Sequence, residues 1–253
     1  MAWEDRYLDL IFVPGGLLIM FGYHLHLLYR ILKQPHTTVV GYENHNKKAW
    51  VERLMNEADI PHAGIALQVI SSNSSAATVL ASLSISLSSL IAALAGTLSN
   101  SKILETIVYG DKSSTVAVIK YISLLSCFLI AFACFVQAAR YFVHSNFLIS
   151  TPNTIVPLKY VQQDIVKAGN YWSAGIRALY FAIVLLLWIF GPIPMFVASV
   201  IMVSALSVLD SNSCPMHDYG NVGQSRWNRL SAELKSITHR TGQDGAANVK
   251  TVK

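Results

Sequence analysis

The chain has 253 residues, of which 53% are hydrophobic and only 13% charged, and its net charge is +5. An average soluble domain carries about 25% charged residues, so this composition argues against a water-soluble globule. Nearly all Lys and Arg residues flank long apolar blocks, where charge sets orientation and binds lipid headgroups rather than nucleic acid. We therefore expect a multi-pass membrane protein with the lipid bilayer as its partner and no nucleic acid.

The first apolar block covers about residues 7–32. It exceeds the ~20 residues that a helix needs to cross the hydrocarbon core. Pro14, Gly15 and Gly16 are expected to loosen or kink it. A cleavable signal peptide begins with basic residues and ends at a small-residue site, and neither is evident here. We therefore expect this block to be retained as the first span.

A polar connector follows and contains the pattern of an amphipathic helix. Val51 and Leu54 begin a set of apolar residues at the i, i+3, i+4, i+7 spacing of one helix face. Asn44 is the predicted N-cap of this helix and Pro61 the residue that stops it. The sequence therefore predicts a short helix that lies against the membrane or against other helices.

The second and third apolar blocks cover about residues 72–98 and 115–143. The second is apolar enough to insert into a membrane, yet it is rich in Ser, Thr, Ala and Gly. A second polar connector follows the third block, over residues 145–171. It contains another predicted amphipathic helix, which begins at Pro157 and ends at Gly169.

The last apolar stretch, residues 173–209, is too long for one ordinary span. As a helix it would measure about 55 Å, against a hydrocarbon core of ~30 Å. The sequence Gly-Pro-Ile-Pro at residues 191–194 lies in its middle. The stretch is either one kinked helix that projects beyond the bilayer, or a hairpin of two spans, residues 173–190 and 193–209.

The distribution of positive charge decides between these alternatives. Cytosolic segments of membrane proteins are the basic ones. Only five crossings place both basic connectors and the basic tail on one side of the membrane. We therefore predict an all-α polytopic membrane helical bundle, in which four long apolar blocks make five crossings, with the N-terminus outside and the C-terminus cytosolic. Short amphipathic helices lie on the cytosolic side.

A basic tail, residues 213–253, follows the membrane domain of residues 1–212. Within the tail, Trp227 and Leu230 begin an apolar stripe at helical spacing. This pattern predicts one amphipathic helix suited to an anionic inner leaflet. After residue 241 the chain shows no periodicity, and we expect it to be disordered.

The second block carries a continuous stripe of hydroxyl residues. They recur at steps of three or four, so a helix places them on one face. The members of this hydroxyl stripe are Ser71, Ser75, Thr78, Ser82, Ser86 and Ser89. Such small residues let helices pack closely and hydrogen-bond across the contact. Alternatively, hydroxyls that face a path replace part of an ion's hydration. The sequence leaves both hypotheses open.

A second set of candidate residues is basic and flanks the apolar blocks. These residues either contact lipid phosphate or form an anion-binding vestibule. They are Arg30, Arg140, His144, Arg177, Arg226 and Arg229. The chain has no HExxH, GxSxG, CxxC or Walker-type motif. We therefore expect no catalytic residues, no metal and no cofactor.

Several strings in the chain resemble a known family. In order they are KKAWVERLM, SNSSAATVLASLSISL, NFLISTP and LLLWIFGPIPMFVASVIMVSALSVLD. Their order over about residues 3–212 is similar to that of the plant branch of the domain-of-unknown-function 599 family. The resemblance implies a plant multi-pass membrane protein and brings no activity and no functional residues. The second block is richer in Ser than the resemblance leads us to expect.

Two functional hypotheses follow from the residues. The hydroxyl stripe and the basic residues at one membrane face favour a small homo-oligomeric ion channel or transporter-like protein, with the second span near the path. The alternative is a membrane scaffold or interaction protein without transport activity. Its amphipathic cytosolic helices would bind partners or anionic lipid headgroups.

Overall fold

The structure, a computed structural model, describes four stretches of the chain, residues 2–56, 60–98, 114–151 and 156–215. The chain divides into two units, Met1–Cys214 and Pro215–Lys253, and all the helices named below belong to the first. The predicted amphipathic helix of the tail, with Arg226 and Arg229, lies outside the described residues, as does the segment after residue 241.

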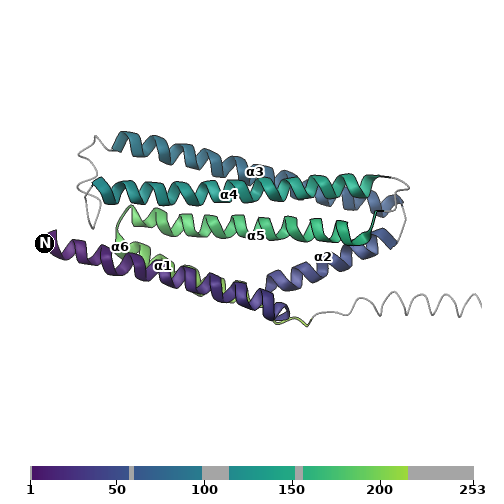
Figure 1. Cartoon of the computed structure of the whole chain (residues 1–253), viewed down its shortest axis with the longest axis horizontal. Helices are drawn as coiled ribbons and strands as arrows, with labels where there is room; N and C mark the ends of the chain where they lie inside the picture. Colours follow the sequence, from purple (N-terminus) through teal and green to yellow (C-terminus); the bar gives the residue numbers. More distant parts are fainter. Residues whose placement is uncertain (1, 57–59, 99–113, 152–155, 216–253) are drawn as a thin grey trace, which may run out of the picture. The chain divides into compact units, whose positions relative to one another are not determined.

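The described stretches are almost entirely helical and contain no β-strand. In chain order the elements are α1 (Ala2–Lys33), the short 3-10 helix η1 (Pro35–Thr37), α2 (Val39–Asn56), α3 (Ile60–Leu98), α4 (Ser114–Ser150), α5 (Leu158–Trp188) and α6 (Pro192–Leu209) (Figure 1). Every α-helix except α2 is long and apolar enough to cross a membrane. The predicted all-α polytopic bundle with five membrane-spanning helices is therefore confirmed.

The five spans contact one another in a row. α3 packs against α4, α4 against α5, α5 against α6, and α6 against α1, while α2 packs mainly against α5 (Figure 1). Within the most apolar part of each span, only 22–28% is buried by the rest of the chain. Two spans, α3 and α1, therefore lie at the ends of the row, each with one main partner among the spans.

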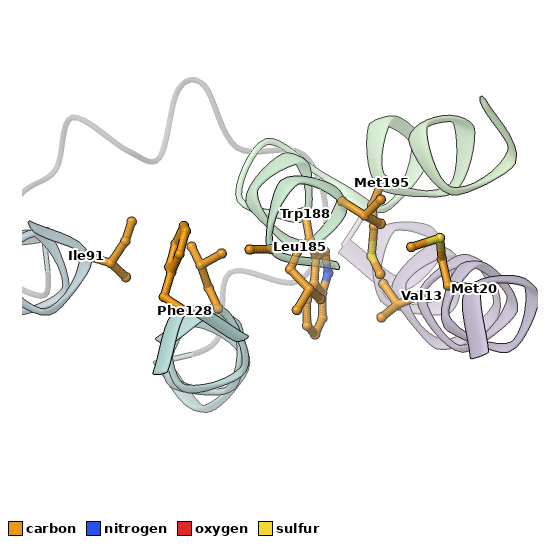
Figure 2. Close-up of a cluster of buried hydrophobic side chains, with 10 residues drawn as sticks. Val13, Met20, Ile91, Phe128, Leu185, Trp188 and Met195 are labelled. Atoms are coloured by element: carbon orange, nitrogen blue, oxygen red, sulfur yellow. The ribbon is translucent and has the colours of Figure 1, made fainter. Parts of the chain in front are cut away.

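A cluster of buried apolar side chains joins all five spans. Figure 2 labels seven of its members, which are Val13 and Met20 of α1, Ile91 of α3, Phe128 of α4, Leu185 and Trp188 of α5, and Met195 of α6. Lipid tails are as apolar as these side chains, so close packing rather than escape from water holds such a cluster together in a membrane.

The turn between α5 and α6 confirms the predicted hairpin. Gly191 adopts φ 152° and ψ 169°, a backbone region that is essentially restricted to glycine. Pro192 begins α6, where the missing N–H is not needed and the fixed φ suits a helix start. Gly and Pro therefore act together to reverse the chain at this point.

Three predicted helix boundaries are wrong. Asn44 lies inside α2 and is not its N-cap, and its side-chain amide donates to Asn170 Oδ1 at 2.9 Å. Pro61 lies in the first turn of α3 and stops no helix, because proline is tolerated at that position. Gly169 lies inside α5 rather than at the end of a separate helix. A Cβ at Gly169 would lie 2.6 Å from Lys47 Nζ, so the Lys47 side chain of α2 lies against this glycine.

The Pro-Gly-Gly sequence of the first span also has a packing role. α1 continues as one helix through Pro14. A Cβ on Gly16 would lie 2.8 Å from Ser199 Oγ, and one on Gly15 would lie 3.5 Å from Phe196 Cε2. Gly16 therefore lets the backbone of α1 approach α6 closely, as small residues do in membrane helices, whereas a Cβ on Gly15 would make an ordinary contact.

Candidate functional site

All six residues of the hydroxyl stripe lie on the exposed side of α3. α3 packs on α4 with a different face, whose buried residues include Ala77, Ala81, Ser84 and Ser88. Periodicity correctly places the stripe on one face of a helix. The stripe is not the face that packs within this part of the chain, and it faces whatever surrounds α3 in the membrane.

The hydroxyl groups of the stripe are satisfied by their own helix. Ser75, Thr78, Ser82, Ser86 and Ser89 each donate to the carbonyl oxygen four residues earlier, over distances of 2.8–3.0 Å. This pattern removes the cost of an unsatisfied donor in lipid. It also directs each hydroxyl hydrogen inward, so the oxygen keeps lone pairs with which it can accept further interactions.

Arg177 takes part in a junction that sequence reasoning misses. Its guanidinium donates two hydrogen bonds to the carboxylate of Asp210, at 2.8 and 3.1 Å, and Tyr23 Oη donates a third at 2.6 Å. The Arg177 and Asp210 side chains are only 19% and 13% exposed. We call these three residues the carboxylate junction. It joins α1, α5 and α6 through one acidic group.

Backbone hydrogen bonds extend the junction to the connector between α1 and α2. Thr38 and Ser211 form an isolated antiparallel bridge, in which Val39 N donates to Asp210 O and Asn212 N donates to Thr37 O, both at 3.0 Å. Arg30 Nη2 donates to Thr37 O at 2.9 Å. The guanidinium of Arg30 is therefore used to fix this connector.

The other basic candidates divide into one paired residue and one exposed residue. His144 Nδ1 lies 2.6 Å from Asp164 Oδ2, which ties α4 to α5. Arg140 is exposed on α4. Arg30, Arg177 and His144 thus make contacts within the chain, whereas Arg140 lies at the surface.

A second polar contact lies at the opposite end of the spans. The Trp188 indole N–H donates to Asp9 Oδ1 at 3.1 Å, and Lys120 Nζ lies 5.5 Å from the centroid of the Trp188 ring. Lys120 is buried, and a cation over an indole face is favourable when water is excluded. Polar side chains therefore join α1, α4 and α5 at this end. Within the described ranges no group of His, Cys, Asp or Glu residues could hold a metal ion.

Five apolar helices, packed through small residues and joined by polar contacts at both ends, define an integral multi-pass membrane protein. A family model described as "Protein of unknown function, DUF599" matches residues 11–215. The chain therefore belongs to this family, and the resemblance seen in the sequence is confirmed at the level of the family. No curated protein and no solved structure matches the chain.

Proposed function

We propose that this protein is a small homo-oligomeric channel in which the hydroxyl stripe of α3 faces a conduction path shared between copies. The observation that carries the proposal is the exposure of all six stripe residues on a span at the end of the row. One chain cannot enclose a path along this face, because α3 has only α4 as a main partner among the spans. A ring of α3 helices around an axis would enclose it.

The orientation of the hydroxyl groups favours cations as the permeating species. Five of the six stripe hydroxyls donate to a carbonyl oxygen of their own helix, so their oxygen atoms present lone pairs outward. Oxygen atoms can replace part of the hydration shell of a cation without placing a buried charge in the membrane. The guanidinium groups of Arg30 and Arg177 are engaged within the chain, which weakens the case for an anion vestibule.

We propose the topology with the N-terminus outside and the C-terminus cytosolic. The basic residues Arg30, Arg140 and Arg177 gather at one end of the spans, and positive charge favours the cytosolic side. Arg140, being exposed, is then available to anionic lipid headgroups. We assign no catalytic role to any residue.

A membrane scaffold is the second candidate, and one observation favours it. The stripe hydroxyls already have acceptors in their own helix, and their side chains are small. Such a face lets two helix backbones approach closely without needing a solvated path between them. A scaffold would therefore use the same oligomer contact without conduction.

Disulfide cross-linking tests the oligomer that both candidates require. Single cysteines at Ser75 or Ser82, in a chain whose native cysteines are replaced by Ala, should form disulfide-linked dimers in liposomes. A cysteine at Leu83, on another exposed face of α3, is the matched control and should cross-link much less. Equal cross-linking at Ser82 and Leu83 would contradict a specific α3 contact.

Flux measurements then separate the channel from the scaffold. The purified protein in liposomes should pass monovalent cations, and Ser82→Ala with Ser86→Ala should change the flux. Ser126→Ala is the matched control, because Ser126 is an exposed hydroxyl on α4 that donates to its own helix in the same way. Cross-linking without flux under varied ions, voltages and lipids would exclude the channel and support the scaffold.

A further inference from the structure

A cavity of about 430 Å³ lies between α2 and the spans α3, α4 and α5. It exists because α2 packs on α5 but makes little contact with α3. Most of its wall is apolar and includes Trp50 of α2, Ile70 of α3, Phe142 of α4 and Trp172 of α5. Its volume lies within the range of about 300–1,000 Å³ that is usual for binding pockets.

One edge of the cavity carries a pair of opposite charges. Glu43 and Lys47 of α2 line it, with Lys47 Nζ 3.0 Å from Glu43 Oε2. Their side chains are 51% and 31% exposed, so both can reach a ligand at the mouth. Trp50 lies on the same face of α2, one turn beyond Lys47. The end of the Lys47 side chain lies against Gly169 of α5. This contact and the Glu43 carboxylate together position the ammonium group.

The position of the cavity along the helices indicates an amphiphilic ligand. The wall residues Val69, Phe142 and Ile165 belong to α3, α4 and α5, which are long and apolar enough to cross a membrane, whereas the charged edge belongs to α2, which is not. Apolar groups cover the apolar part of this wall more favourably than water does, and lipid chains surround membrane-spanning helices. Trp side chains such as Trp50 and Trp172 are typical of the boundary between lipid chains and headgroups. An acyl chain therefore fits the wall, and a headgroup fits the edge.

We infer that this cavity binds one zwitterionic glycerophospholipid with a choline headgroup. Its phosphate pairs with Lys47, and its quaternary amine lies beside Glu43 and over the Trp50 ring, where a cation gains from the π face. One of its acyl chains occupies the apolar wall. An anionic lipid would match Lys47 but would leave its net charge next to the Glu43 carboxylate. The inference does not depend on conduction or on the oligomer proposed above.

Native mass spectrometry of the purified full-length protein tests the headgroup assignment. The protein in detergent is titrated with phosphatidylcholine or phosphatidylglycerol, and retained lipid is counted. We expect one phosphatidylcholine to be retained per chain in preference to phosphatidylglycerol. Lys47→Gln should weaken retention of both lipids about tenfold, since it removes a charge-assisted contact. Glu43→Gln should weaken only phosphatidylcholine. Lys48→Gln, at the exposed neighbouring position, should change neither.

A second pair of variants tests the acyl-chain assignment. Val69 lines the cavity and is 46% exposed, and Val79 is 58% exposed on the same helix but outside the cavity. Val69→Phe fills the cavity and should abolish retention of the single phosphatidylcholine, whereas Val79→Phe should leave it unchanged. The inference is overturned if the unmodified protein retains both lipids equally or neither lipid. It is also overturned if Val69→Phe and Val79→Phe behave alike.

Discussion

Replacing Arg177 by Met removes two of the three hydrogen bonds that the Asp210 carboxylate accepts, and leaves only the bond from Tyr23. Met keeps much of the apolar stem, so lost packing contributes little. The Asp210 side chain is 13% exposed, and water therefore cannot fully replace the guanidinium. Removing one partner of a buried ion pair costs about 3–5 kcal/mol. Because Tyr23 still donates, we expect a loss near the lower limit of this range.

A double-mutant cycle separates the lost pair from other effects of the substitution. Asp210→Asn removes the charge that Arg177→Met leaves without its partner. The double variant should therefore lose less than the sum of the single variants, by about 1 kcal/mol or more. Tyr23→Phe, which removes one hydrogen bond to a carboxylate that keeps its Arg, should cost about 1.5 kcal/mol.

The measurement is equilibrium unfolding in mixed micelles with increasing SDS, followed by the loss of helical circular dichroism. Arg140→Met is the matched control, because Arg140 is exposed on α4 and its replacement should change the free energy of unfolding by less than about 0.5 kcal/mol. A loss for Arg177→Met no larger than that of Arg140→Met would refute the reasoning. Strict additivity in the cycle would show that Arg177 and Asp210 do not stabilise each other.

Three further predictions concern the turn, the α1–α6 contact and the topology. Gly191→Ala should lower the free energy of unfolding by about 1–3 kcal/mol, because Ala rarely adopts the observed φ; an unchanged SDS unfolding curve would contradict the turn geometry. Gly16→Ile should destabilise the same transition, whereas Gly22→Ile should not, since no atom lies within 4 Å of a Cβ at Gly22. In sealed cells, a membrane-impermeant thiol reagent should label Ile193→Cys, at an exposed position just past the turn, but not the exposed Cys214; the reverse pattern would overturn the proposed orientation.

Much of the fold could be predicted because membrane crossing depends on local sequence. Long apolar runs identify the spans, and the distribution of positive charge favours five crossings over four. The Gly-Pro pair at residues 191–192 marks the reversal between α5 and α6. Helix boundaries were less predictable. Gly169 has the residue type of a helix end, yet it lies inside α5, where the Lys47 side chain of another helix lies against it. No local pattern shows that contact.

The candidate site could be predicted only in part. The 3.6-residue period places Ser82 and Ser86 on one face, and the structure agrees. The period cannot say which face of α3 meets α4, because the buried face is also made of small residues such as Ala81 and Ser84. The carboxylate junction could not be predicted from the sequence for another reason. Asp210 lies 33 residues from Arg177 and 187 from Tyr23, and such pairings are set by the tertiary arrangement.

The contact between α1 and α6 sets an order for the assembly of the chain. Among the five spans described, α1 is made before the others, and its main partner, α6, is made after them. α3, α4 and α5 can pair with their neighbours as soon as each is complete. α1 can contact α5 through Asp9 and Trp188, but its main contact forms only when α6 is made and Asp210 reaches Tyr23. A chain cut short before Pro192 would thus leave α1 without its main partner among the spans.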